Sequence, residues 1–181
     1  MRRQAGFTLI ELLITISIVG VLVAAAVPNF KTTIQNNRLV SQGNDLLGAF
    51  LYARSQAISL SKTVTVCASS DGASCSTDWS QGWIICQEAA AATTDCSGGA
   101  TILRKHEALS GSNTVYSSLG GGVSFVSSGL TVAGTANGYI NICDTRGASY
   151  GRSLWINSTG FTRLSTTAGK RLDGTSLSCT S

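Results

Sequence analysis

Residues 7–27 read FTLIELLITISIVGVLVAAAV, and this stretch decides how the chain is organised. Its only charged residue is Glu11. A helix rises about 1.5 Å per residue, so this one spans roughly 30 Å, the thickness of a bilayer core. Arg2 and Arg3 stand before it, and positive charge on this flank predicts a cytoplasmic N-terminus. We therefore expect a single membrane-spanning helix.

The same stretch has an alternative interpretation as a cleavable secretory signal. Residues 23–26 (VAAA) offer the small side chains of a signal-peptidase site, and cleavage there would leave a soluble exported domain. A carboxylate buried inside a membrane segment is energetically costly and usually marks a function. A carboxylate at the membrane interface carries no such cost and needs no function to explain it. The residues around Glu11 decide between these interpretations.

The hexapeptide Gly6-Phe7-Thr8-Leu9-Ile10-Glu11, followed by an apolar run, resembles the processing motif of type IV prepilins and pseudopilins. The resemblance implies that a prepilin peptidase cuts after Gly6 and methylates the new amine of Phe7. It also implies that Glu11 pairs with the N-terminal amine of a neighbouring subunit during assembly. Two opposite charges in a low dielectric neutralise each other only at the correct subunit stagger.

Beyond Pro28, the sequence from 29 to 61 has the apolar spacing of an amphipathic helix. Steps of three, four and seven residues place one set of apolar side chains on a single face: Leu39, Leu46, Phe50, Ala53, Ala57 and Leu60. Polar positions such as Gln42 are expected mostly on other faces. A long helix from residue 7 to about 61 follows, with Pro28 as a possible kink.

After residue 61 the sequence favours short antiparallel strands. Gly-rich and Asn/Asp-containing turns separate the strand candidates, which are 63–68, 82–86, 100–104, 122–126, 139–143, 153–156 and 161–164. Residues 87–99 have low complexity and are expected to form a surface loop. The fold class is therefore α+β. We divide the chain into 1–6 (leader), 7–28 (assembly helix), 29–61 (amphipathic helix) and 62–181 (β-rich domain).

The second half carries a closer resemblance. The segments Ala53-Arg54-Ser55-Gln56-Ala57-Ile58, Val64-Thr65-Val66-Cys67 and Asp78-Trp79-Ser80-Gln81-Gly82-Trp83 resemble the FimT/FimU/GspH group of minor pilins and pseudopilins. In this group we expect structural roles for Arg54, near the helix end, and for Trp79 and Trp83, beside a glycine turn.

This resemblance implies a pilin-like fold in which one long N-terminal helix packs on an antiparallel sheet domain. It implies a subunit that helps to initiate or cap a type IV pilus or a type II secretion pseudopilus. The expected partners are other major and minor pilins or pseudopilins, prepilin peptidase and the bacterial inner membrane, with the domain in the periplasm. One chain does not separate the two filament systems.

Composition argues against catalysis. Charged residues make up 12% of the chain, against about 25% in an average soluble protein. Nine carboxylates and one histidine, His106, leave little material for acid–base or metal chemistry. We therefore expect no catalytic residue, no metal site and no cofactor, and hence no enzyme; adhesion to a surface stays open.

The chain has six cysteines without a CxxC pair, which indicates disulfides in an oxidising compartment more than zinc. Six cysteines allow 15 complete pairings. Cys67–Cys75 would close a short loop and Cys86–Cys96 would staple the low-complexity loop. Cys143–Cys179 would anchor the C-terminal tail, a placement also implied by the resemblance to FimU-like proteins.

The alternative function is DNA binding at a pilus tip for natural transformation. Residues 144–181 carry a net charge of +3, and their cations are Arg146, Arg152, Arg163, Lys170 and Arg171. Some FimT-like pilins take up DNA through a GRxR element, but Phe161 stands where its first arginine would be. The sequence shows no basic stripe interleaved with aromatic residues, as single-strand binding favours. A solvated strand edge explains the same charges.

Overall fold

The computed structural model describes residues 6–90 and 94–180 and divides the chain into two compact units, 1–37 and 38–181. Helix α1 (Leu9–Leu60) runs through both units and continues through Pro28. Thr8 caps its first turn, because its Oγ1 accepts a hydrogen bond from the Glu11 backbone N–H at 3.3 Å. Thr8-x-x-Glu11 is thus the spacing of a capping box, which satisfies amide groups left unpaired at a helix start.

In the first unit, α1 exposes its apolar side chains. Leu9 is 76% exposed and Val21 is 71% exposed. Within the part of the chain that the structure describes, α1 is the one helix long and apolar enough to cross a membrane. Its most apolar window buries none of its surface inside the protein.

In the second unit, α1 buries one face against the sheets. Five of the six predicted core positions on this face are buried: Leu39, Leu46, Phe50, Ala53 and Ala57. The sixth prediction is wrong, because Leu60 is 40% exposed. Leu60 ends the helix, and Ser61 turns the chain away with a positive φ of 52°.

Gln42 is buried, although the sequence placed it among the polar positions outside the core. Its Oε1 accepts a hydrogen bond from Asn113 Nδ2 at 2.5 Å, and its Nε2 donates to the carbonyl of Ser110 at 3.1 Å. The amide is tolerated in the interior because both its polar atoms have partners. It ties α1 to the segment before strand β4 (Thr114–Ser117).

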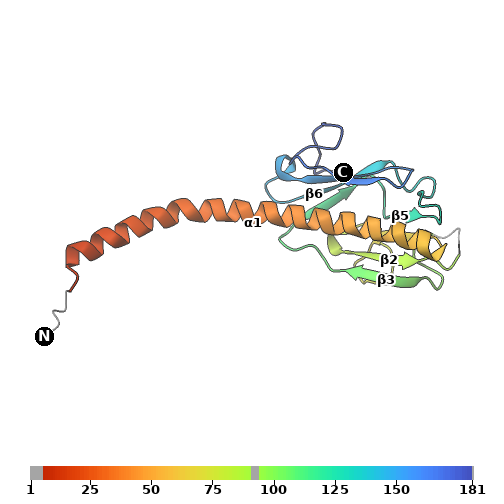
Figure 1. The fold of residues 1–181 in the computed structure, drawn as a ribbon, viewed down its shortest axis with the longest axis horizontal. Coiled ribbons are helices and arrows are strands. Elements are labelled where there is room, and N and C mark those ends of the chain that lie inside the picture. Colours follow the sequence, from red (N-terminus) through yellow and green to blue (C-terminus); the bar gives the residue numbers. More distant parts are fainter. Residues whose placement is uncertain (1–5, 91–93, 181) are drawn as a thin grey trace. The chain divides into compact units, whose positions relative to one another are not determined.

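Within residues 6–90 and 94–180, eight strands form two four-stranded antiparallel sheets. The first sheet has the order β3-β2-β1-β5, with β1 (Val64–Ala68), β2 (Trp83–Gln87), β3 (Thr101–His106) and β5 (Gly122–Phe125). The second has the order β4-β6-β7-β8, with β4 (Thr114–Ser117), β6 (Gly138–Cys143), β7 (Arg152–Ile156) and β8 (Thr162–Leu164). In Figure 1 the second half of α1 runs between β6 on one side and β2 and β3 on the other.

Strand β4 is absent from the sequence-based predictions. It has four residues, TVYS, of which Thr114 is exposed and the other three are half-buried. So short a segment carries little periodicity of its own. It becomes a strand because it pairs with β6, in a register that sets Val115 opposite Ile142.

The core lies between α1 and the inner faces of both sheets. Phe50 packs against Trp79 and Phe125, with ring centroids 5.9 Å and 6.4 Å apart. The outer face of the first sheet is covered as well, by a smaller cluster of Ile84 with Cys67, Cys86 and Cys96, against which Cys75 packs. Strand β1 is therefore buried on both faces.

Candidate functional site

The residues predicted to direct processing and assembly lie at the start of the chain that the structure describes. Gly6 and Phe7 precede α1, and Phe7 is 84% exposed. Glu11 lies exposed in the first turn of α1. A carboxylate here faces the partial positive charge of the helix N-terminus. Sequence reasoning missed the cap that the Thr8 hydroxyl provides at the Glu11 backbone N–H, although the Thr8-x-x-Glu11 spacing signals it.

All six cysteines are paired in disulfides, as Cys67–Cys75, Cys86–Cys96 and Cys143–Cys179. These are the three pairs that the sequence suggested. The third links the last residue of β6 to the C-terminal tail. Two groups of cysteine and glutamate side chains are close enough to surround an ion. Their sulfurs are consumed in disulfides, however, and a metal needs thiolates.

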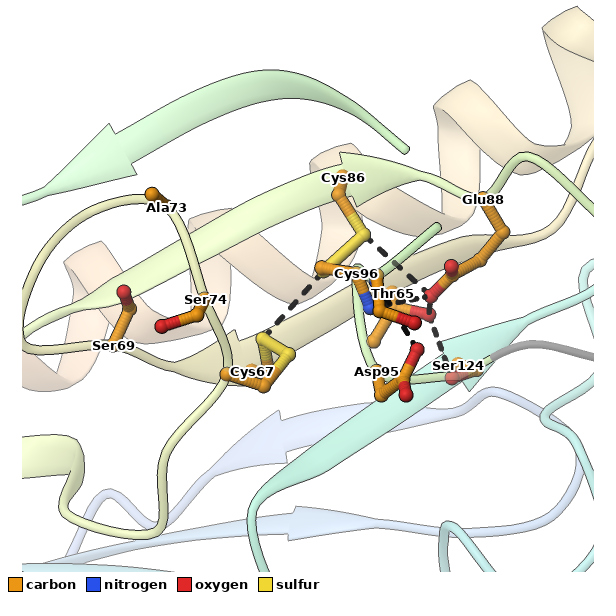
Figure 2. The surroundings of a disulfide bond; sticks show 12 residues. Thr65, Cys67, Ser69, Ala73, Ser74, Cys86, Glu88, Asp95, Cys96 and Ser124 are labelled. Atoms are coloured by element: carbon orange, nitrogen blue, oxygen red, sulfur yellow. Dashed lines mark hydrogen bonds between the residues drawn. A yellow bond between two sulfur atoms is a disulfide. The ribbon is translucent and has the colours of Figure 1, made fainter. Parts of the chain in front are cut away.

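Two of the disulfides meet on the outer face of the first sheet beside a buried carboxylate, as Figure 2 shows. Glu88 is 2% exposed, and its Oε1 accepts from the Thr65 hydroxyl at 2.5 Å and from the Cys96 backbone N–H at 3.2 Å. Thr65 Oγ1 lies 2.8 Å from the Ser124 hydroxyl. This network joins β1, β5 and the segment after β2.

The residues that carry the family resemblance occupy structural positions. Arg54 donates from Nε to the carbonyl of Gly129 at 2.9 Å and from Nη2 to that of Thr159 at 3.4 Å, so α1 holds two loops. Trp79 is buried and its Nε1 donates to the carbonyl of Gly120 at 3.1 Å. Trp83 stacks on His106, with ring centroids 3.8 Å apart.

The five cations proposed for DNA do not form one surface. Arg146 is held in an ion pair with Asp144 at 2.6 Å and lies over the Tyr150 ring, so its guanidinium group already has a carboxylate partner. Arg152 shares the inner face of β7 with Leu154 and donates to the carbonyl of Thr166 at 2.6 Å. The ion pair between Asp144 and Arg146 could have been predicted from the sequence, because the two residues are only two positions apart.

Arg163 lies exposed on β8. It pairs with Trp155 in the antiparallel register, and Leu154 and Leu164 face the core, so Arg163 points to the outer face, opposite to Arg152. Lys170 is exposed and donates to the Ser176 hydroxyl at 3.2 Å. Arg171 lies 4.8 Å from the centroid of the Tyr139 ring.

A row of side chains that sequence reasoning missed crosses the outer face of the second sheet. Tyr139 on β6 lies opposite Trp155 on β7, and Trp155 lies opposite Arg163 on β8. The Tyr139 and Trp155 ring centroids are 4.5 Å apart, with the rings tilted by 44°. The Arg171 guanidinium lies over Tyr139 at the other end of the pair of rings. The linear sequence has no such stripe, and these residues come together only because strand pairing joins distant segments.

Tyr139 is fixed at its hydroxyl end, which donates to Asp173 Oδ2 at 3.1 Å. Burial, and then this hydrogen bond to a carboxylate, raise the pKa of Tyr139. Asp173 itself accepts from the side chain and backbone of Thr175, and these bonds lower its pKa. The phenol is therefore neutral and Asp173 ionised at neutral pH.

These features define a pilin-like protein, in which a long apolar N-terminal helix continues into a globular domain of two antiparallel sheets. Residues 42–160 match the family described as type II transport protein GspH, and residues 1–27 match the prokaryotic N-terminal methylation motif. The chain belongs to the GspH family. No curated protein matches the sequence significantly.

Solved structures show the same fold. The type IV minor pilin FimU of Pseudomonas aeruginosa PAO1 is 26% identical, with a TM-score of 0.57 over 72% of this chain and 90% of FimU. The minor pseudopilin EpsH from the type II secretion system of Vibrio cholerae is 14% identical. Its TM-score is 0.51 over 75% of this chain and 98% of EpsH.

Proposed function

We propose that this protein is a minor subunit that helps to initiate or cap a type IV pilus or a type II secretion pseudopilus. Family membership and the similarity to FimU, a type IV minor pilin, support this role. A structural function agrees with a chain whose cysteines are all in disulfides and whose single histidine is stacked on Trp83.

The observation that carries the proposal is the exposed apolar surface of α1 in the first unit. Phe7, Leu9 and Val21 are each more than 70% exposed. Burying such surface is favourable by about 25 cal/mol per Å². A bilayer before assembly and a bundle of subunit helices after it both supply that burial. Glu11 inside such a bundle requires a cationic partner, for which the N-terminal amine of a neighbouring subunit is suited.

Maturation and location follow from the same proposal. A prepilin peptidase cuts between Gly6 and Phe7 and methylates the new amine. The mature chain is anchored in the inner membrane, and the residues after Pro28 lie in the periplasm, where disulfides form. Intact-mass measurement of the membrane-extracted protein tests the processing, since it should show a chain that begins at methylated Phe7. A chain that begins near Ala26 would contradict it.

Deletion of the gene tests the function, with piliation, exoprotein secretion and natural transformation scored separately. We expect loss of piliation or of secretion, restored by the wild-type chain. Glu11→Ala should be processed and inserted but fail to restore the lost trait, and the matched carboxylate Glu11→Asp should restore part of it. Full restoration by Glu11→Ala would contradict the pairing role.

DNA binding for uptake remains a second candidate, favoured by the exposure of Arg163 and Lys170. Contacts to phosphates alone would be independent of sequence and would weaken steeply with salt. A gel shift with duplex DNA at two salt concentrations tests it. Phe161→Arg, which restores the GRxR pattern, should strengthen the shift; no shift at low salt would eliminate this candidate.

A further inference from the structure

A groove of about 440 Å³ is lined by α1 on one side and by β8 and the residues that follow it on the other. Its wall on α1 is mostly apolar and consists of Val40, Asn44, Leu47 and Leu51, of which Leu51 is 48% exposed. At 1.5 Å per residue this wall is about 16 Å long, which is the length of a strand of about five residues. The groove therefore has the length of one short extended segment laid beside β8.

β8 is an edge strand, and β7 is its one partner among the described strands. In an antiparallel pair, residues that exchange backbone hydrogen bonds alternate with residues whose N–H and C=O groups point away from the partner. The Ser165 N–H donates to the carbonyl of Ser153 on β7 at 2.7 Å. This bond sets the alternation, so the backbone groups of Thr162 and Leu164 point to the open edge. They are the kind of groups to which an extended peptide adds as a further strand.

The apolar end of the groove lies near the start of β8. Leu164 is close enough to α1 that a Cβ added at Gly43 would lie 3.0 Å from its Cδ1. Arg54, three turns further along α1, donates to the carbonyl of Thr159, which precedes β8. Helix and strand therefore run in opposite directions. Leu51, near Arg54 on the helix, accordingly lies beside the first residues of β8.

The opposite end of the groove carries the positive charge of Arg152. This side chain is half-buried, and its Nη1 donates to the carbonyl of Thr166 at 2.6 Å. That is the one hydrogen bond that its five N–H donors make to the described residues, and its Nε is shut off from solvent without an acceptor. Among the described residues that line the groove there is no carboxylate. A guanidinium partly removed from water attracts a carboxylate more strongly than an exposed one.

We propose that this groove binds an extended acidic segment of a partner protein, which adds a fifth strand to the second sheet beside β8. The backbone of the segment pairs with Thr162 and Leu164. Its apolar side chains cover Leu47 and Leu51, and its carboxylate binds Arg152 in bidentate hydrogen bonds. This inference goes beyond the proposed function and does not depend on filament assembly.

The two ends of the groove specify the order of side chains in the segment. Antiparallel pairing is slightly more stable than parallel pairing, so the segment runs from the Arg152 end to the Leu51 end. Side chains on one face of a strand recur at every second residue. The matching segment is therefore acid-x-apolar-x-apolar. Its three inward-facing residues lie opposite inward-facing residues of β8, so they also carry the N–H groups that bond to the open edge.

Fluorescence anisotropy of the labelled peptide TETVTVT, titrated with the full-length protein in nonionic detergent, tests the proposal. We expect saturable binding. TKTVTVT, in which lysine replaces the glutamate, should bind at least about 10-fold more weakly, because a charge-assisted hydrogen bond is lost. TETVTVT with both valine amides N-methylated should also bind at least about 10-fold more weakly, because two backbone donors to β8 are lost. Equal binding of the three peptides, or no saturable binding of the first, would overturn the proposal.

Two pairs of variants locate the site. Leu51→Asn should weaken binding by about 5-fold because the peptide covers this side chain. Ile58→Asn is its matched control, since Ile58 is 51% exposed on the same helix but lies outside the groove. Arg152→Ala should weaken binding by at least about 10-fold. Arg104→Ala removes the same charge from a guanidinium that lies over the Tyr52 ring, and it should bind as wild type does. Equal losses within either pair would overturn the proposal.

Amide hydrogen exchange reads the strand pairing directly and needs no substitution. The N–H groups of Thr162 and Leu164 should exchange quickly in the free protein, since they point to the open edge. Saturating TETVTVT should slow both by at least about 10-fold, because each gains a backbone acceptor. The Arg163 N–H, on the side of β8 that faces Trp155, should exchange slowly with and without peptide. Binding that leaves Thr162 and Leu164 unprotected would contradict strand addition.

Discussion

Cys67 and Cys96 belong to different disulfides, yet their sulfur atoms lie 3.6 Å apart, in contact on the outer face of the first sheet. Figure 2 shows the two sulfurs facing each other. The sequence separates these cysteines by almost thirty positions and offers no sign of the contact. A thiolate released at either position would therefore lie in contact with the other disulfide, at a distance suited to thiol–disulfide exchange.

Cys75→Ser should expose this exchange. The Cys67 thiolate, now without a partner, can attack Cys96, so that the Cys86–Cys96 bond breaks, Cys67–Cys96 forms and Cys86 leaves as a thiolate. Disulfide mapping after acid quenching and alkylation should find both pairings. In the control Cys143→Ser, both bridges of the first sheet should remain native. Recovery of Cys86–Cys96 alone from Cys75→Ser would contradict the exchange.

Glu88 should be required as an acceptor. Glu88→Leu removes the oxygen that accepts from the Cys96 N–H and from the Thr65 hydroxyl. The Thr65 hydroxyl keeps Ser124 as a partner, whereas the Cys96 N–H loses this acceptor, and a buried donor left unpaired costs about 1–3 kcal/mol. We expect Glu88→Leu to lower the free energy of unfolding by about 1–3 kcal/mol. Glu88→Gln, which keeps a carbonyl oxygen, should lose less. Urea unfolding measures both, and equal losses would refute this account.

Gly82 should tolerate no side chain. It ends the turn between Trp79 and Trp83 with φ at 114°, and a Cβ there would collide with the carbonyl oxygen of His106. We expect Gly82→Ala to unfold at clearly lower urea concentration than wild type. Gly98→Ala is the control, since its φ is 62° but nothing lies within 4 Å of the added carbon. It should cost only about 1 kcal/mol of backbone strain.

Asp71 should make stability depend on acid pH. Its carboxylate accepts from the Ser74 hydroxyl and from the backbone N–H groups of Ser74 and Ala73, which hold its pKa well below the usual range. A depressed pKa contributes stability at neutral pH that is lost as the pH falls through the folded-state value. The difference in Tm between wild type and Asp71→Asn should therefore shrink towards pH 2. A constant difference would contradict the assignment.

Much of the fold could be predicted from local patterns in the sequence. Three- and four-residue spacing gave the second half of α1 with its core residues Leu39, Leu46 and Phe50. Alternation in two segments, and turn signals around five others, gave seven of the eight strands in the described residues to within a few residues. Such patterns are readable because they repeat along the chain. Gln42 and Leu60 depart from these patterns, because their burial depends on what lies beside the helix. Gln42 is buried because Asn113 pairs with its amide. Leu60 is exposed because it lies at the end of the helix and of the domain.

The sequence by itself determined the apolar helix, the Gly6-Phe7 junction with Glu11 and the group of pilins that the chain resembles, because each is a contiguous motif. Only the tertiary structure decided that Tyr139, Trp155, Arg163 and Arg171 stand in one row while Arg152 faces the other way. A shift of strand register by one residue would move these side chains to the opposite face. Register is set by pairing between distant segments, so it is settled only when the sheet closes around its core.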